Sequence, residues 1–203
     1  MAKIKMCGMM RPADVINARD LGADYVGFVL TDGFKRSIGL GTFCELKGYL
    51  VGTETKSVGV FVDEPIENML KYYAAMLDMI QLHGSEDNDY IRTLRLHTDK
   101  PIIKAFRITS EEDVQAAKDS IADYVLLDSG TGTGKAFDHS LIKDLDRDYF
   151  LAGGLTAENV AAAIEELSPF AVDVSTSLET EGRKDKKKMT AFVKAVRTKG
   201  QSL

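Results

Sequence analysis

The sequence of 203 residues contains no tryptophan, only two cysteines and four prolines, and no apolar run near the roughly 18 residues of a membrane span. The cysteines, Cys7 and Cys44, have neither the C-x-x-C spacing of zinc and redox motifs nor the density of a disulfide framework. The residues that follow Met1 lack the continuous apolar core of a signal peptide. We therefore expect a protein of the reducing cytoplasm that does not enter a membrane.

Positive charge is scarce as well. The 26 lysine and arginine residues are outnumbered by 31 aspartate and glutamate residues, and the formal net charge is −5. The chain lacks the broad basic face that nucleic acid requires, so nucleic-acid binding is disfavoured. Of the three histidines, only His83 falls at the end of a predicted strand, whereas a metal site needs several converging ligands. We expect no metal site.

What the sequence does contain is an alternation of short apolar stretches with segments of helical period. One helical segment, near the C-terminus, places Met189, Phe192 and Val196 on a single face. Eight candidate strands alternate with such segments. They begin near Lys3, Tyr25, Lys56, Met79, Pro101, Asp123, Asp148 and Ala171.

Local signals mark the starts of several predicted helices. Pro12 and Pro65 suit a first helical turn, where no N–H donor is needed. Ser110 opens an acidic run that resembles a capping box, and Thr156 stands as a predicted N-cap.

Eight strand–helix units in 203 residues average about 25 residues each, which suits one (β/α)8 barrel, the TIM-barrel fold, near its lower size limit. We therefore expect a single domain that spans residues 1–203. The tetrapeptide Ala-Asp-Tyr-Val at 23–26 recurs at 122–125, about half a barrel later. Active sites of this fold lie at the carboxyl ends of the strands, so the chemistry is expected there.

Two loops of small residues follow the last two predicted strands. The first contains Gly153 and Gly154, and the second contains Ser175 and Thr176. Loops at these positions commonly bind phosphate, because small residues leave backbone N–H groups uncovered near a helix N-terminus. The alternative is that the glycine pair only turns the chain into its helix.

A glycine-rich run at 130–135 fits neither common nucleotide motif. The Walker pattern requires glycine where Ser129 stands and serine or threonine where Ala136 stands, and the dinucleotide pattern lacks its last glycine. We interpret this run either as a mobile loop over the site or as a simple flexible connection.

Three side chains at predicted strand or loop ends are candidates for chemistry. Cys7 precedes Gly8, which lets the chain turn and exposes the sulfur, although a lone cysteine is often only a small buried side chain. Asp128 closes an apolar strand, where a carboxylate is costly unless it has a task, a partner or a capping role. Arg36 is suited to clamp a carboxylate through its planar fork, and the alternative is a solvated surface charge.

Together, the motifs of this chain closely resemble those of the phosphoribosylanthranilate isomerase family of tryptophan biosynthesis. The resemblance spans nearly the whole chain, and the motifs follow the order and spacing of the family. They are Lys5-Met6-Cys7-Gly8, Gly27-Phe28-Val29, Arg36, Val58-Gly59-Val60-Phe61-Val62, Gln81-Leu82-His83-Gly84, Leu127-Asp128, Gly132-Thr133-Gly134-Lys135, Leu151-Ala152-Gly153-Gly154-Leu155, Val172-Asp173-Val174-Ser175 and Lys184-Asp185.

The resemblance implies that Cys7 is the general base, that Asp128 is the general acid and that Arg36 binds the anthranilate carboxylate. The other residues implied in substrate binding are His83, Asp173, Gly153, Gly154, Ser175 and Thr176. The implied reaction is an Amadori rearrangement of N-(5-phosphoribosyl)anthranilate to 1-(2-carboxyphenylamino)-1-deoxyribulose 5-phosphate, without redox change and without a cofactor. The expected partner is this small phosphorylated substrate, and relatives of this type are monomers or homodimers.

Ser177 departs from the family pattern, which has glycine there. If the position requires a positive φ, serine is expected to weaken phosphate binding. Two rival functions are open. The related phosphoribosyl isomerase of histidine biosynthesis uses two aspartates on a substrate with two phosphates, and Cys7 argues against it. A non-catalytic phosphosugar-binding barrel would keep the phosphate loops but lose the pair Cys7 and Asp128, and both are present.

Overall fold

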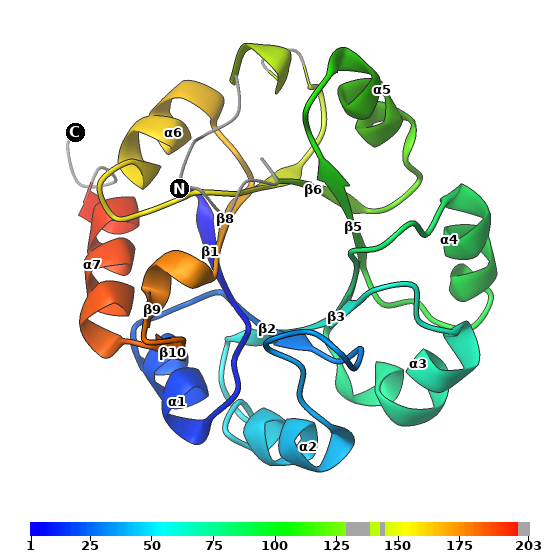
Figure 1. The fold of residues 1–203 in the computed structure, drawn as a ribbon, viewed down its shortest axis with the longest axis horizontal. Coiled ribbons are helices and arrows are strands. Elements are labelled where there is room, and N and C mark those ends of the chain that lie inside the picture. Colours follow the sequence, from blue (N-terminus) through cyan, green and yellow to red (C-terminus); the bar gives the residue numbers. More distant parts are fainter. Residues whose placement is uncertain (129–138, 143–144, 199–203) are drawn as a thin grey trace.

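The computed structural model describes residues 1–128, 139–142 and 145–198, so the glycine-rich run at 130–135 lies outside the described residues. Eight parallel strands close into a barrel in chain order, and β1 completes it by pairing with β8 (Figure 1). Each strand begins within one residue of its predicted position, and the (β/α)8 fold is confirmed. The strands are β1 (Lys3–Cys7), β2 (Tyr25–Val29), β3 (Lys56–Phe61), β4 (Met79–Leu82), β5 (Ile102–Arg107), β6 (Tyr124–Asp128), β7 (Tyr149–Ala152) and β8 (Ala171–Val174).

Helices surround the barrel on its outside (Figure 1). A short hairpin of two antiparallel strands, β9 (Glu179–Thr180) and β10 (Arg183–Lys184), stands between β8 and the last helix. The short 3-10 helices are η1 (Ala74–Met76), η2 (His139–Ile142) and η3 (Thr176–Leu178). The α-helices of the described residues are α1 (Pro12–Asp20), α2 (Leu40–Gly48), α3 (Ile66–Tyr72), α4 (Asn88–Arg95), α5 (Glu111–Asp119), α6 (Val160–Leu167) and α7 (Lys186–Arg197).

The sixth strand–helix unit differs from the expectation of a full helix. After β6 the described residues form only η2. Between residues 139 and 148 the apolar residues are Leu141, Ile142 and Leu145, all of which pack against the core. The described part of this unit therefore contributes its apolar side chains to the core without an α-helix.

The predicted helix starts are only partly correct. Pro12 is the first residue of α1, Pro65 immediately precedes α3, and Ser110 forms the predicted capping box with Asp113. Thr156 stands four residues before α6, and its Oγ1 accepts a hydrogen bond from the backbone N–H of Glu158 (3.2 Å), as an N-cap side chain does. The backbone N–H of Thr156 donates to the side chain of Asn159 (2.8 Å), an arrangement that stabilises a turn before the helix.

The barrel interior changes in character along its axis. At the amino ends of the strands it holds a cluster of aromatic rings, with Tyr25 and Tyr124 packed edge-on against Phe150. Because side chains alternate along a strand, Ile4 and Met6 of β1 pack toward the helices while Lys5 and Cys7 point inward. The barrel interior is therefore apolar at the amino ends of the strands and polar toward their carboxyl ends.

At the amino ends, three aspartates each precede an even-numbered strand, and we call them the aspartate ring (Asp24, Asp78 and Asp123). Each carboxylate accepts a hydrogen bond from a backbone N–H near the start of the preceding strand and pairs with a basic side chain from a helix. The N–H donors are Ile4 (2.8 Å), Ser57 (2.8 Å) and Ile102 (2.7 Å), and the basic partners are Arg197, Lys47 and Arg95.

The aspartate ring gives the repeated tetrapeptide a structural meaning. Asp24 and Asp123 are the aspartates of the two copies, and they occupy equivalent positions before β2 and β6, half a barrel apart.

In the part of the chain that the structure describes, no helix is long and apolar enough to cross a membrane.

Candidate active site

The carboxyl ends of the strands gather the residues predicted for the site. Cys7 and Asp128 are the last residues of β1 and β6, and His83 directly follows β4. Arg36 lies in the loop after β2, and its neighbour Ser37 pairs with Val29 at the end of that strand. All four residues are thus placed around one rim of the barrel.

A cavity of about 360 Å³ opens between the loops that follow β7 and β8. Gly153 and Gly154 have φ values of 86° and 64°, left-handed conformations that glycine adopts without strain. The predicted site residues that line this cavity are Asp128, Asp173, Gly153, Gly154, Ser175 and Thr176. The two loops and the carboxylate at the end of β6 therefore share one enclosed space.

Ser177 joins these two loops. Its Oγ donates a hydrogen bond to the carbonyl oxygen of Leu155 (2.6 Å). Ser177 is not among the described non-glycine residues with positive φ, which are Asp63, Ser168 and Glu181. The condition under which serine would strain this loop is therefore not met, and the side chain instead makes a bond that glycine cannot make.

The inward-pointing Lys5 forms an ion pair with Asp173 inside the barrel. Lys5 is fully buried, and its Nζ lies 2.9 Å from Oδ1 of Asp173 on the adjacent strand β8. Burial alone would lower the pKa of Lys5, but electrostatic interactions and hydrogen bonds with Asp173 and Cys7 raise it above its ordinary value. A permanent positive charge therefore lies next to the Cys7 thiol.

Ser175 ties the cavity to the cysteine strand. Its Oγ donates to the backbone carbonyl of Cys7 (3.0 Å), and the buried Lys184 donates to both the carbonyl (3.0 Å) and the Oγ (3.1 Å) of Ser175. Burial lowers the pKa of Lys184, although its partner Glu179 opposes that shift. One hydrogen bond thus ties the β8 loop to the end of β1, and two more tie Lys184 of β10 to the same loop.

His83 stands at the rim beside Gln81. The Nδ1 atom of its ring lies 2.8 Å from Nε2 of Gln81, whose Oε1 is the one buried side-chain oxygen or nitrogen atom without a hydrogen-bond partner among the described residues. The strand ends desolvate the ring, although one side is open to solvent, and this lowers the pKa of His83 against the opposing charge of Asp128. The imidazole is therefore neutral at neutral pH.

The guanidinium of Arg36 is neither wholly free to clamp a ligand nor a solvated surface charge. Its Nε and Nη2 atoms donate to the two carboxylate oxygens of Glu179, at 2.6 and 2.9 Å, and Nη2 also donates to Thr176 Oγ1 (3.2 Å). Its stem crosses Gly8, where a Cβ atom would lie 2.4 Å from Arg36 Cδ. One edge of the guanidinium is thus already occupied by a carboxylate of the protein.

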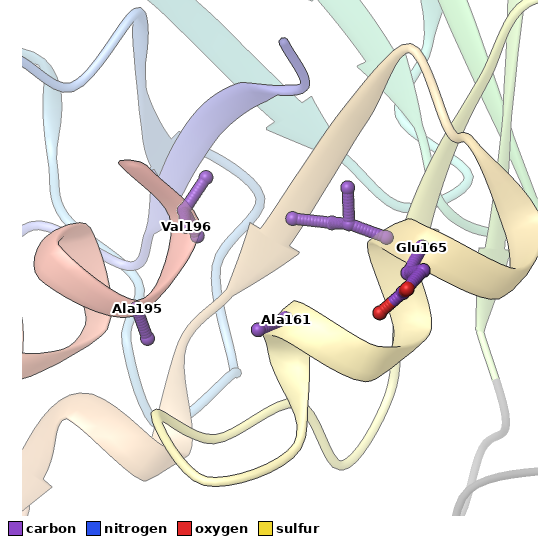
Figure 2. Close-up of a pocket in the computed structure, with 5 residues that line it drawn as sticks. Ala161, Glu165, Ala195 and Val196 are labelled. Carbon is purple, nitrogen blue, oxygen red and sulfur yellow. The ribbon is translucent and has the colours of Figure 1, made fainter. Parts of the chain in front are cut away.

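Other features do not join this site. Cys44 is exposed on α2, with its sulfur 3.9 Å from that of Met76. A second hollow, between α6 and α7, shares no lining residue with the loop cavity; Figure 2 shows Ala161 and Glu165 of α6 facing Ala195 and Val196 of α7 across it. Within the described residues, no group of three His, Cys, Asp or Glu side chains is arranged to hold a metal ion.

Sequence reasoning missed the role of two residues. Glu179 follows the β8 loop without any motif that marks it, and Lys184 was noted only as part of a late Lys-Asp pair. Lys5 was more accessible to prediction, because its alternation with Ile4 and Met6 already directs it inward. Only the tertiary contacts identify the partners of all three.

A closed (β/α)8 barrel with a thiol, carboxylates and a loop cavity at the carboxyl ends of its strands defines the class of barrel enzymes that act at that end. A family model described as N-(5′-phosphoribosyl)anthranilate (PRA) isomerase matches residues 4–195. The chain belongs to this family. It catalyses the isomerisation of phosphoribosylanthranilate in tryptophan biosynthesis, as the sequence resemblance predicted, and this assignment is favoured over both rival functions.

Individual relatives agree. The chain is 42% identical over 205 residues to the N-(5′-phosphoribosyl)anthranilate isomerase of Thermoanaerobacter sp. strain X514, covering 97% of this chain and 98% of that one. A crystal structure of monomers generated from the dimeric Thermotoga maritima enzyme has a TM-score of 0.86, 35% identity and coverage of 98% and 100%. A structure in complex with reduced 1-(o-carboxyphenylamino)-1-deoxyribulose 5-phosphate has a TM-score of 0.85, 33% identity and the same coverage.

Proposed function

We propose that Cys7 and Asp128 perform the proton transfers of this isomerisation, on a small phosphorylated substrate held between Arg36 and the two small-residue loops. The observation that carries the proposal is the loop cavity, because its wall contains both Asp128 and the glycine and serine loops, and Ser175 links it to Cys7. Asp173 also lines this cavity, and His83 stands at the end of β4 on the same rim of the barrel. Asp173 enters this role already paired with Lys5.

Asp128 acts first, as the general acid. Its carboxyl proton passes to the ring oxygen of the ribose while the bond between C1 and that oxygen breaks. The lone pair of the anthranilate nitrogen forms the C1–N double bond, which gives an open-chain iminium ion. A carboxylic acid within hydrogen-bond reach of that oxygen is suited to the step.

Cys7 acts second, as the general base. Its thiolate removes the proton from C2, and the electron pair of that C–H bond neutralises the iminium to give an enolamine, which tautomerises to the ketose. Lys5 precedes Cys7 by two residues on the same inward face of β1, so its ammonium lies beside the reacting sulfur. The atoms balance without any oxidant or reductant.

The two anionic ends of the substrate are bound by different groups. The backbone N–H groups around Gly153, Gly154 and the Ser175 loop are suited to the phosphate, since uncovered amides near a helix start attract anions. Arg36 is suited to the anthranilate carboxylate. Two anions at opposite ends of one substrate thus orient it with C1 and C2 between the acid and the base.

Three wider features belong to the same proposal. Residues 1–203 form a single domain that works as a monomer or a homodimer, because every residue proposed for the site comes from one chain. The protein acts in the cytoplasm, where the two free thiols of Cys7 and Cys44 remain reduced. Analytical ultracentrifugation measures the oligomeric state directly.

A kinetic isotope experiment tests whether Asp128 is the acid and Cys7 is the base. Turnover is followed as the loss of anthranilate fluorescence after adding freshly prepared phosphoribosylanthranilate, with hydrogen or deuterium at C2. Cys7→Ala should slow the C2 step and reveal a primary isotope effect, whereas Asp128→Ala should slow ring opening and suppress that effect. Near-normal turnover by Cys7→Ala, or the same isotope effect in both variants, would contradict the proposed roles.

A further inference from the structure

One buried carboxylate at the carboxyl end of the barrel, which we call the mouth, takes no part in the proposed proton transfers. Glu179 opens β9 and is only 8% exposed. It accepts hydrogen bonds from Nε and Nη2 of Arg36 (2.6 and 2.9 Å) and from Nζ of Lys184 (2.9 Å). It does not line the loop cavity. Two cations on one carboxylate leave it no proton to exchange, so its function must be exerted through its partners.

The contact with Arg36 determines which edge of the guanidinium is free. Nε and Nη2 face Glu179, and Nη2 also reaches Thr176. Within residues 1–128, 139–142 and 145–198, Nη1 donates no hydrogen bond. Because a guanidinium is planar and rigid, holding one edge fixes the direction of the other nitrogen.

The stem of Arg36 is constrained as well. It passes over the backbone of Gly8, where any side chain would collide with Cδ, and Gly8 directly follows Cys7. A side chain held at its stem and along one edge has few rotamers left. The unoccupied Nη1 is therefore presented in one orientation beside the end of β1 before any ligand arrives.

We propose that Glu179 is a positioning residue that orients Arg36, so that Nη1 meets the carboxylate of the substrate. The inference rests on the proposed role of Arg36. Glu179 lies 143 residues from Arg36 in the sequence and belongs to the hairpin that follows the phosphate loop. A residue that follows the phosphate-binding loop thus orients the arginine that binds the carboxylate of the substrate.

A pair of ligands separates this role from a merely structural one. The first is reduced 1-(o-carboxyphenylamino)-1-deoxyribulose 5-phosphate, and the second is the same compound with phenyl in place of carboxyphenyl. The ratio of their dissociation constants, measured by calorimetry, reports how strongly the protein reads the carboxylate. Both ligands share the phosphate, so a general loosening of the site changes both constants alike.

Glu179→Gln keeps the shape of the side chain but places an amide N–H against a guanidinium N–H, which disrupts the fork. We expect it to weaken binding of the carboxylated ligand about 10-fold, because a small misorientation of a positioned group is costly. Binding of the phenyl ligand should change less than about 2-fold. Equal weakening of both ligands, or no change in either, would overturn the positioning role.

Two further variants make every outcome decisive. Arg36→Met should abolish the preference for the carboxylated ligand, and adding Glu179→Gln to it should have no further effect on the preference. If Arg36→Met keeps the preference for the carboxylated ligand, the proposed role of Arg36 fails, and the inference fails with it. If Arg36→Met loses the preference but Glu179→Gln keeps it, only the positioning role of Glu179 fails. Should Glu179→Gln not fold, Glu179→Asp retains the charge while withdrawing it by one methylene, and an unchanged preference there would overturn the proposal.

Discussion

The two ends of the barrel use the same kinds of charged side chain in different ways. In the aspartate ring, Asp123 and its partner Arg95 are 37% and 36% exposed, and the carboxylate also accepts a backbone N–H. At the carboxyl end, the side chains of Lys5 and Asp173 are 0% and 11% exposed, and those of Lys184 and Glu179 are 1% and 5% exposed. Exposed pairs add little by charge alone, whereas a buried charge that loses its partner is costly.

This difference teaches where stability and chemistry reside. The aspartate ring holds neighbouring strands together at the end opposite the loop cavity, so its residues should contribute to folding alone. The carboxyl end brings desolvated charges next to a thiol and a cavity, where the proposed mechanism has them orient reacting groups.

The largest effect is expected at the acid and base of the mouth. Cys7→Ala and Asp128→Ala should each reduce kcat by about 10²- to 10⁴-fold, the usual contribution of a positioned acid or base, with little change in product binding. Steady-state fluorescence assays and product titrations measure both quantities. The pH profile of kcat/KM for the unaltered enzyme should be bell-shaped, and a flat profile between about pH 5 and 9 would contradict the mechanism.

Cys44→Ala is the matched control for loss of a thiol and should keep full activity, because Cys44 is exposed on α2 away from the cavity. The double variant of Cys7 and Asp128 should be barely worse than the poorer single variant, since both residues serve one proton path. Simple additivity of the two losses would argue that they act independently.

At the opposite end, Asp123→Ala should destabilise the fold and spare the chemistry. The buried N–H of Ile102 loses its acceptor, and leaving such a donor unsatisfied costs about 1–3 kcal/mol in the free energy of unfolding. Urea denaturation measures this loss, and kcat/KM at low temperature should stay unchanged. Asp89→Ala, which breaks an exposed pair with Arg92, is the control and should cost at most about 1 kcal/mol. A fall in kcat/KM without a loss of stability would remove the contrast between the two ends.

The charges at the mouth should also give stability a characteristic acid dependence. Burial alone would raise the pKa of Glu179, but hydrogen bonds from Arg36 and Lys184 outweigh it and hold the pKa at about 2. Because this pKa lies below the ordinary value near 4.5, the folded carboxylate contributes stability above about pH 4.5 that is lost as the pH falls toward 2. Urea midpoints of the unaltered protein and Glu179→Gln should therefore converge over that interval. A constant gap down to pH 2 would show that ionisation of Glu179 is not the source of the stability.

The smallest effect is expected where the two loops meet. Ser177→Gly removes the hydrogen bond to Leu155, worth about 0.5–1.5 kcal/mol, so competitive inhibition by inorganic phosphate should weaken by about 2- to 10-fold. This reverses the expectation from sequence, in which glycine was the better residue at this position. Inhibition that is equal or stronger in the variant would restore that expectation.

Much of the fold could be predicted because its signals are local. Strand starts follow from short apolar stretches, Ser110 marks its helix through a capping box of neighbouring residues, and the two glycines after β7 stand where the backbone needs left-handed conformations. Local signals also misled. Thr156 caps a turn through its bonds with Glu158 and Asn159, but α6 itself begins only at Val160, and the described residues after β6 form a 3-10 helix rather than the expected α-helix.

By itself, the sequence determined the barrel, the end of the barrel that holds the site and the residue types at the strand ends, since period, glycine placement and strand alternation are properties of neighbouring residues. Only the tertiary structure decided the partners: Arg36 with Glu179, Lys5 with Asp173 and Ser175 with the carbonyl of Cys7. These contacts join residues more than 140 positions apart, across the seam where β8 closes on β1. Closure of the barrel brings them together, and no local pattern can encode which distant charge will be desolvated beside which.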